Sequence, residues 1–195
     1  VLGAHLDRLS ETHRQWRDFT RNNLIAVLRE VIACFPVYRT YIGPETLDLS
    51  AADRTVIDTA VAEARRRNPA MSAAVFDYVH DVLRLYSPAS HGSEAQQAQR
   101  LFVQRFQQLT GPIMAKGLED TAFYVHNSLI SRNEVGGDPL RTEPPTDLDG
   151  FHRFNAQRSV QWPHTLNATS THDTKRSEDT RARIFDPFFT TKFTG

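Results

Sequence analysis

Apolar residues recur at three- and four-residue steps through most of the first 110 residues. This spacing places them on one face of a helix. It predicts helices over residues 11–35, 51–67, 73–83 and 93–110. Residues 1–110 are therefore expected to form a mainly helical region, and they carry few groups that suggest chemistry.

Helix-ending and helix-starting residues separate these segments. Pro36 ends the first apolar pattern, and Gly111 with Pro112 is expected to stop the last one. Ser50 is a candidate N-cap because Asp53 follows it at the third helical position.

The pattern changes after residue 110. Residues 111–117 (GPIMAKG) and 164–171 (HTLNATST) predict two short strands. Residues 119–131 and 151–163 predict helices, and the turn-rich residues 133–150 predict a loop between them.

Charge and cysteine content limit the partners and the compartment. The chain has 23 Lys+Arg against 23 Asp+Glu, and this balance argues against a nucleic-acid or anionic membrane partner. The single cysteine, Cys34, excludes an intrachain disulfide and favours a reducing, cytoplasmic location. Its apolar neighbours predict a buried, inert thiol. No segment is long and apolar enough to predict a membrane span.

The segment TSTHDTKRSED, residues 169–179, is the first candidate site. A strand followed by a polar loop and a helix exposes reactive groups at the carboxyl end of a barrel strand. Asp173 with its neighbour His172 suits sugar hydroxyls, which both donate and accept hydrogen bonds. Alternatively, Asp173 simply pairs with Lys175 or Arg176, as exposed charges often do.

The segment KGLEDTAFY, residues 116–124, is the second candidate. Lys116, Glu119, Asp120 and Tyr124 could line a polar pocket at the end of a strand. Acidic residues in a first helical turn also need no functional explanation. The eight histidines lack metal-ligand spacing, and the chain has no phosphate loop or nucleophile elbow.

Four long motifs occur in an order that resembles a known family: KGLEDTAFY, NEVGGDP, FHRFNAQRSVQWP and TSTHDTKRSEDTRARI. Together they resemble the maltooligosyltrehalose synthases of the α-amylase clan, over residues 1 to about 184. The stretch FPVYRTYI resembles part of that family's helical insertion. The resemblance implies an α/β fold: a partial (β/α)8 barrel from residues 111–184, with a large, mainly helical insertion subdomain over residues 1–110.

The same resemblance implies an intramolecular transglucosylation. The reducing-end α-1,4 linkage of a maltooligosaccharide or α-1,4-glucan becomes an α,α-1,1 linkage, and neither a metal nor an organic cofactor is expected. Asp173 matches the third acidic residue of the clan, which holds sugar hydroxyls beside the reacting carbon. His172 matches the accompanying sugar-binding histidine. Six further residues lie in the matching motifs as expected substrate-binding groups: Lys116, Glu119, Asp120, Tyr124, Lys175 and Arg176.

Two departures from the family pattern limit what this chain is expected to do alone. The nucleophile and acid/base carboxylates of a retaining mechanism have no counterpart here, so we expect an internal fragment, beginning at Val1 rather than Met, that is inactive alone. Residues 185–195 look foreign: the segment IFDPFFTTKFTG, residues 184–195, resembles a segment beside the ATP lid of sensor histidine kinases. This predicts a chimeric end.

Other classes of function remain open at this point. The chain could be a fragment of an α-amylase-type hydrolase, a non-catalytic helical interaction module or a remnant of a nucleotide-binding kinase. The oligomeric state is not indicated.

Overall fold

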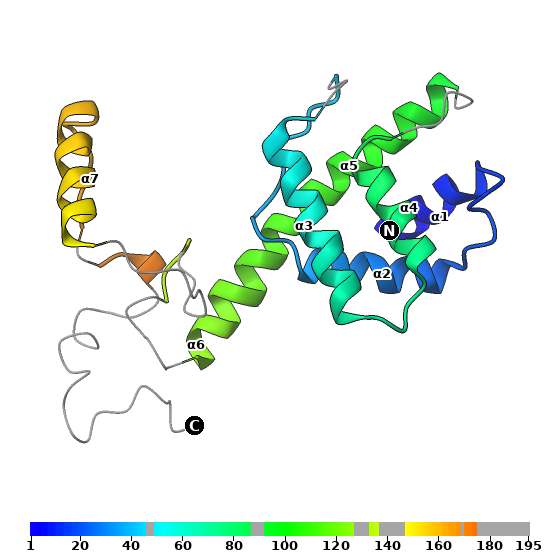
Figure 1. Ribbon diagram of the computed structural model, residues 1–195, viewed down its shortest axis with the longest axis horizontal. Coiled ribbons are helices and arrows are strands. Elements are labelled where there is room, and N and C mark those ends of the chain that lie inside the picture. The colour runs from blue at the N-terminus through cyan, green and yellow to red at the C-terminus, as the bar shows by residue number, and fades with distance from the viewer. Residues whose placement is uncertain (46–48, 87–91, 127–132, 137–146, 169, 175–195) are drawn as a thin grey trace. The chain divides into compact units, whose positions relative to one another are not determined.

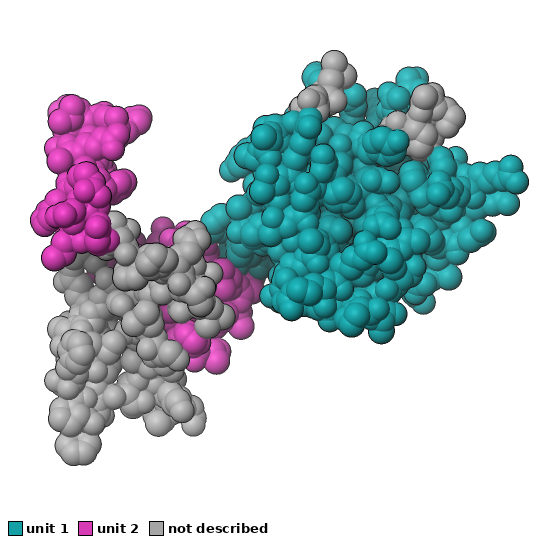
Figure 2. Space-filling model, in the orientation of Figure 1, with its two compact units in different colours: residues 1–115 teal, residues 116–195 magenta. Residues whose placement is uncertain are grey.

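The computed structural model describes residues 1–45, 49–86, 92–126, 133–136, 147–168 and 170–174 of the 195-residue chain (Figure 1). The chain divides into two compact units, Val1–Ala115 and Lys116–Gly195, which Figure 2 distinguishes by colour.

The first unit is a bundle of α-helices: α1 (Leu2–Glu11), α2 (Arg21–Ala33), α3 (Ala51–Arg67), α4 (Ala73–Leu83) and α5 (Ser93–Met114). Helix α2 contacts α1, α3 and α4, and α5 packs against α1 and α4. The apolar stripes predicted from the sequence meet in one core. Its largest fully buried side chains are Tyr78, Phe76, Phe102, Phe106, Leu6, Leu24, Ile57, Leu83, Val27 and Val31.

Local signals explain where these helices begin. The Asp53 backbone N–H donates to Ser50 Oγ at 3.0 Å, which confirms the predicted N-cap of α3. Helix α2 begins at Arg21, with Thr20 as its N-cap, so the prediction of one helix from residue 11 was wrong. Residues 12–20 form turns instead, and their apolar side chains pack on the bundle from there. The Trp16 ring, for example, lies 4.7 Å from the Tyr78 ring between centroids.

The extended segment before α3 is held by one buried amide. Gln107 Oε1 accepts from the Ile42 backbone N–H at 2.7 Å and from Thr40 Oγ1 at 2.9 Å, while Gln107 Nε2 donates to the Ile42 carbonyl at 3.0 Å. The side-chain amide thus provides hydrogen-bond partners for the backbone N–H and carbonyl of Ile42, as a neighbouring strand would.

Residues 111–117 are helical, so the predicted strand was wrong. Helix α5 continues through Pro112 to Met114, and the Ala115 N–H donates to the carbonyls of Gly111 and Pro112. A π-helix, η1 (Ala115–Ala122), and one short turn, α6 (Phe123–Val125), follow. A short apolar run does not distinguish a strand from a helix by its periodicity, which is why the sequence pattern misled here.

Helix α7 (Leu148–Gln161) confirms the predicted helix around residues 151–163. Asp147 caps it, because its Oδ1 accepts from the Gly150 N–H at 2.7 Å. None of its residues is buried. After it, the described part of residues 164–171 contains no strand, and neither does the rest of the described chain. The predicted partial (β/α)8 barrel is therefore wrong: residues 111–117 are helical, the described residues of 164–171 form no strand, and a sheet needs paired strands.

Candidate functional site

The π-helix η1 carries the first group of predicted site residues. Lys116 Nζ lies 2.5 Å from Asp120 Oδ2, one helical turn away, and the two side chains are 79% and 35% exposed. Thr121 Oγ1 donates to the Lys116 carbonyl at 2.7 Å, which adds a hydrogen bond across the widened turn. An ion pair this exposed contributes little to stability, so its cation and carboxylate remain accessible to a ligand.

Burial separates the remaining members of this motif. Glu119 is buried, with 6% of its surface exposed, whereas Tyr124 is 42% exposed. The fully buried Phe123 anchors the same turn. Glu119 therefore lies on the inner side of the segment, and Lys116 and Tyr124 lie on its outer side.

A residue that the sequence analysis did not single out holds the end of this segment. Asn133 is fully buried, and its Nδ2 donates to the carbonyls of Phe123 at 2.8 Å and His126 at 2.6 Å. These carbonyls lie at the end of α6, where a helix has no internal donors left. The signal was available, since Asn133 opens the motif NEVGGDP.

Asp173 lies on a tight turn, η3 (His172–Thr174). Its N–H donates to Thr171 Oγ1 at 3.2 Å, and Thr174 Oγ1 accepts from the Thr171 N–H at 2.9 Å. The Val135 N–H donates to the Asp173 carbonyl at 3.2 Å. The backbone of Asp173 is thus fixed on both sides while its side chain is exposed.

The backbone hydrogen bond from Val135 brings two predicted motifs together. Asn133 attaches residues 133–136 to the end of α6, and Val135 attaches the same residues to Asp173. The side chains of His172, Lys175 and Arg176 lie outside the described residues. Their expected roles, including the ion pair of Asp173 with either cation, stay predictions.

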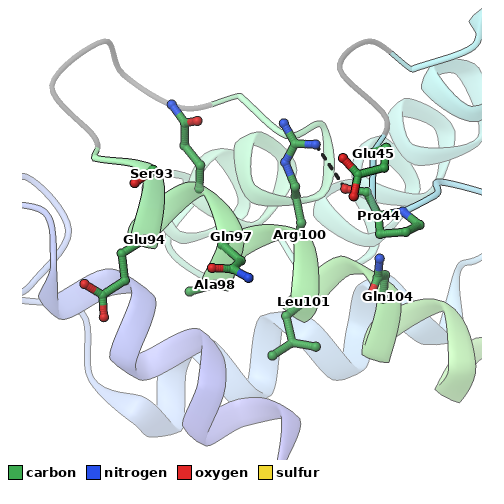
Figure 3. Close-up of a pocket in the computed structure, with 10 residues that line it drawn as sticks. Pro44, Glu45, Ser93, Glu94, Gln97, Ala98, Arg100, Leu101 and Gln104 are labelled. Atoms are coloured by element: carbon green, nitrogen blue, oxygen red, sulfur yellow. Dashed lines mark hydrogen bonds between the residues drawn. The ribbon is translucent and has the colours of Figure 1, made fainter.

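The first unit contains a polar groove of about 680 Å³ (Figure 3). It lies between the Pro44–Glu45 turn and the first half of α5, and Arg100 Nη1 donates to the Pro44 carbonyl at 3.1 Å across it. Gln97, Gln104 and other amide or carboxyl side chains line it. These groups can hydrogen-bond a neutral ligand, but the lining offers no histidine or cysteine for nucleophilic chemistry.

A cluster of charged side chains links α3 to α4 and its C-cap. Asp58 Oδ1 lies 2.8 Å from His80 Nε2 and 2.7 Å from Arg84 Nη1. Partial burial raises the pKa of Asp58, but the hydrogen bonds from His80 and Arg84 outweigh it and hold the pKa below its usual value. The cluster ties two helices together, and its carboxylate stays ionised at neutral pH.

Cys34 is partly exposed rather than buried, which corrects the sequence prediction. Burial of part of its surface raises the pKa of the thiol. The reactive thiolate is therefore disfavoured, so low reactivity is still expected, because of the raised pKa and not because of full burial.

Among the described residues, no group of three or more His, Cys, Asp or Glu side chains could hold a metal ion. No helix within the described ranges combines the length and apolar character that a membrane crossing requires.

The described residues define a mainly helical chain with a polar groove in its first unit and an exposed carboxylate on a fixed turn. The chain is 49% identical over 80 residues to a protein named "Putative maltooligosyl trehalose synthase" from Mycobacterium tuberculosis, in both strain CDC 1551 / Oshkosh and strain ATCC 25618 / H37Rv.

Those 80 residues are 41% of this chain and 10% of each relative, so the chain matches about a tenth of the length of these curated relatives. The similarity supports the resemblance to maltooligosyltrehalose synthases and does not address residues 185–195. No family model matches the chain, and no solved structure matches it.

Proposed function

We propose that this chain is part of a maltooligosyltrehalose synthase, a glucosylmutase that moves the reducing-end glucose of a maltooligosaccharide from an α-1,4 to an α,α-1,1 linkage. The observation that carries the proposal is the 49% identity over 80 residues to two proteins of that name. The substrate would be a neutral α-1,4-glucan, which suits a chain of zero net charge.

Asp173 is the residue that we infer to contact the sugar. Its backbone is held by Thr171 and Val135, and its side chain is exposed. The fixed backbone sets the place from which the exposed carboxylate can accept hydrogen bonds from sugar hydroxyls. Such contacts tighten in an oxocarbenium-like transition state and contribute several kcal/mol in glycoside chemistry.

The other predicted residues would take supporting roles. Lys116, Asp120 and Tyr124 are exposed enough to contact a glucan directly. The buried Glu119 is better placed to position its neighbours than to touch a ligand. His172, Lys175 and Arg176 keep the roles that the resemblance implies.

We infer that this chain binds substrate without converting it. A retaining mechanism requires a nucleophile and an acid/base carboxylate about 5 Å apart, and the family pattern finds neither in these residues. Incubation of the chain with maltopentaose should therefore yield no trehalose-ended product, and also no glucose or maltose, which an α-amylase-type hydrolase would release.

Binding can be tested by titrating maltopentaose into the 15N-labelled 195-residue chain. We expect saturable shift changes, at least tenfold weaker binding in Asp173→Asn, and unchanged binding in Asp149→Asn. Asp149 is a matched control because it is an exposed carboxylate in the first turn of α7. Equal binding of cellopentaose, whose linkages are β-1,4, would contradict an α-glucan site, and so would an equal loss in both variants.

A further inference from the structure

A groove of about 720 Å³ runs between α1 and α5 in the first unit. His5 and Arg8 of α1 and Arg105 of α5 line it together with the apolar Leu9 and Leu101. Glu94, its acidic lining residue, lies eleven positions before Arg105 on α5, or roughly 16 Å along the helix axis. The end of the groove where Arg105 meets His5 is therefore cationic, and the apolar Leu9 and Leu101 each lie one helical turn from that contact.

The contact between Arg105 and His5 is unusual because neither side chain is an acid. Arg105 Nη1 lies 2.7 Å from both ring nitrogens of His5. A guanidinium only donates hydrogen bonds, so His5 must be neutral and offer one nitrogen as the acceptor. Burial of the ring, and then the charges of Arg105, Arg8 and the terminal amine of Val1, lower the pKa of His5.

Neither Arg8 nor Arg105 has a carboxylate partner in the part of the chain that the structure describes. Two arginines elsewhere in the first unit show the ordinary arrangement: Arg65 of α3 pairs with Asp77 at 3.0 Å, and Arg84, the C-cap of α4, pairs with Asp58 at 2.7 Å. Arg105 is also partly buried, and a partly desolvated cation without a counter-charge is unfavourable. An anion from outside the bundle would remove that cost.

We propose that the cationic end of this groove binds the phosphate dianion of a small phosphate monoester. Two guanidinium charges match the two charges of the dianion, and the planar guanidinium fork matches the geometry of phosphate oxygens. The Leu9 and Leu101 surface then accommodates the body of the ligand.

Binding changes the state of His5. A phosphate oxygen takes the Arg105 N–H groups, so the imidazole no longer has to accept from Arg105 and becomes free to bind a proton. The dianion opposes the charges of Arg8, Arg105 and the terminal amine, while Glu94 faces the far end of the groove. Phosphate therefore raises the pKa of His5, and by linkage the affinity for the dianion increases as the pH falls through that pKa, until protonation of the phosphate itself at about pH 6 opposes the gain.

The test uses the whole chain with inorganic phosphate and glucose 6-phosphate, at an ionic strength matched with sodium chloride. The His5 ring shifts are followed by NMR against pH, and affinity is measured by calorimetry. We expect phosphate to move the His5 midpoint upward and sodium chloride to leave it unchanged. Glucose 6-phosphate should bind more tightly than inorganic phosphate, because the groove also holds the body of the ester; tighter binding of inorganic phosphate would overturn the assignment to a monoester.

Variants locate the site. Arg105→Gln and Arg8→Gln should each weaken phosphate binding at least tenfold, and Arg105→Lys should retain part of it. Arg65→Gln is the matched control because it removes the same charge from an exposed pair elsewhere in the bundle. If Arg105→Gln loses its helical circular dichroism, Arg8→Gln and Arg105→Lys decide the matter. An unmoved His5 midpoint, or an equal loss in Arg65→Gln, would overturn the proposal.

Discussion

Replacing Gln107 by Ala should destabilise the first unit far more than replacing the exposed Gln108 beside it. The substitution removes the acceptor for the Ile42 N–H and Thr40 hydroxyl and the donor to the Ile42 carbonyl. All three residues are buried, at 2%, 5% and 3% exposure for Gln107, Ile42 and Thr40. Water therefore cannot fully replace the amide without opening the contact between α5 and this segment.

The size of the effect follows from those three groups. Each buried polar group left without a partner costs about 1–3 kcal/mol. Three such groups, with partial relaxation of the chain around them, place the loss in unfolding free energy at about 3–5 kcal/mol. The better helix propensity of alanine returns only a few tenths of a kcal/mol. Since a domain is commonly stable by about 5–15 kcal/mol, this loss is large.

Urea denaturation followed by circular dichroism at 222 nm measures this loss in unfolding free energy. Gln108→Ala is the control, because Gln108 is the next residue on α5 and is exposed; its substitution should change the free energy of unfolding by less than about 0.5 kcal/mol. The reasoning about the amide is refuted if Gln107→Ala costs no more than Gln108→Ala.

Three further outcomes follow from the first unit. Hydrogen bonds from Arg66 and Arg67 lower the pKa of Glu63 to about 2. The ionised Glu63 therefore stabilises the folded state fully above about pH 4.5, and this contribution is lost as the pH falls toward 2. Glu63→Gln should flatten the curve of unfolding free energy against pH in that range. Since burial raises the pKa of the Cys34 thiol, iodoacetamide at pH 8 should react more slowly with Cys34 than with the thiol of free glutathione, and equal rates would contradict this. Tyr78→Phe removes a buried hydrogen bond to the Leu6 carbonyl at 3.2 Å and should cost about 1 kcal/mol in urea unfolding, while an unchanged midpoint would mean that the bond contributes nothing.

The helical half of the fold was predictable because its signals are local. The apolar stripe from Ile57 to Ala64 and the Ser50 cap define α3 within a few residues of sequence. The start of α2 was not predictable to the same degree, because Trp16 and Phe19 are apolar but pack on Tyr78 from a turn. That contact is tertiary, and no window of neighbouring residues contains it.

The strand predictions failed for a related reason. Residues 111–117 combine Gly, Pro and two large apolar residues, a composition that fits the end of a helix as well as a short strand. The barrel followed from the family resemblance rather than from an alternating pattern, and the described residues contain no strand to support it.

The candidate site was predictable as a set of motifs but not as a geometry. Lys116 and Asp120 could be expected to pair, since they are four residues apart. The hydrogen bond from Val135 to Asp173 joins positions 38 residues apart in sequence, and Asn133 links them to α6 through its side chain. Only the folded chain shows these contacts, and the roles assigned to the site residues remain predictions.

The π-helical turns of Ala115–Ala122 have a consequence for mutagenesis. A π-turn accommodates one more residue than an α-turn, so the loss of a single amino acid here is absorbed by a return to ordinary helical winding, and the later side chains keep their directions. Phe123 would then stay buried and Tyr124 would stay exposed. Shortening this stretch by one residue should thus be tolerated better than the same deletion in the middle of α5, where it would rotate every later side chain by about 100°.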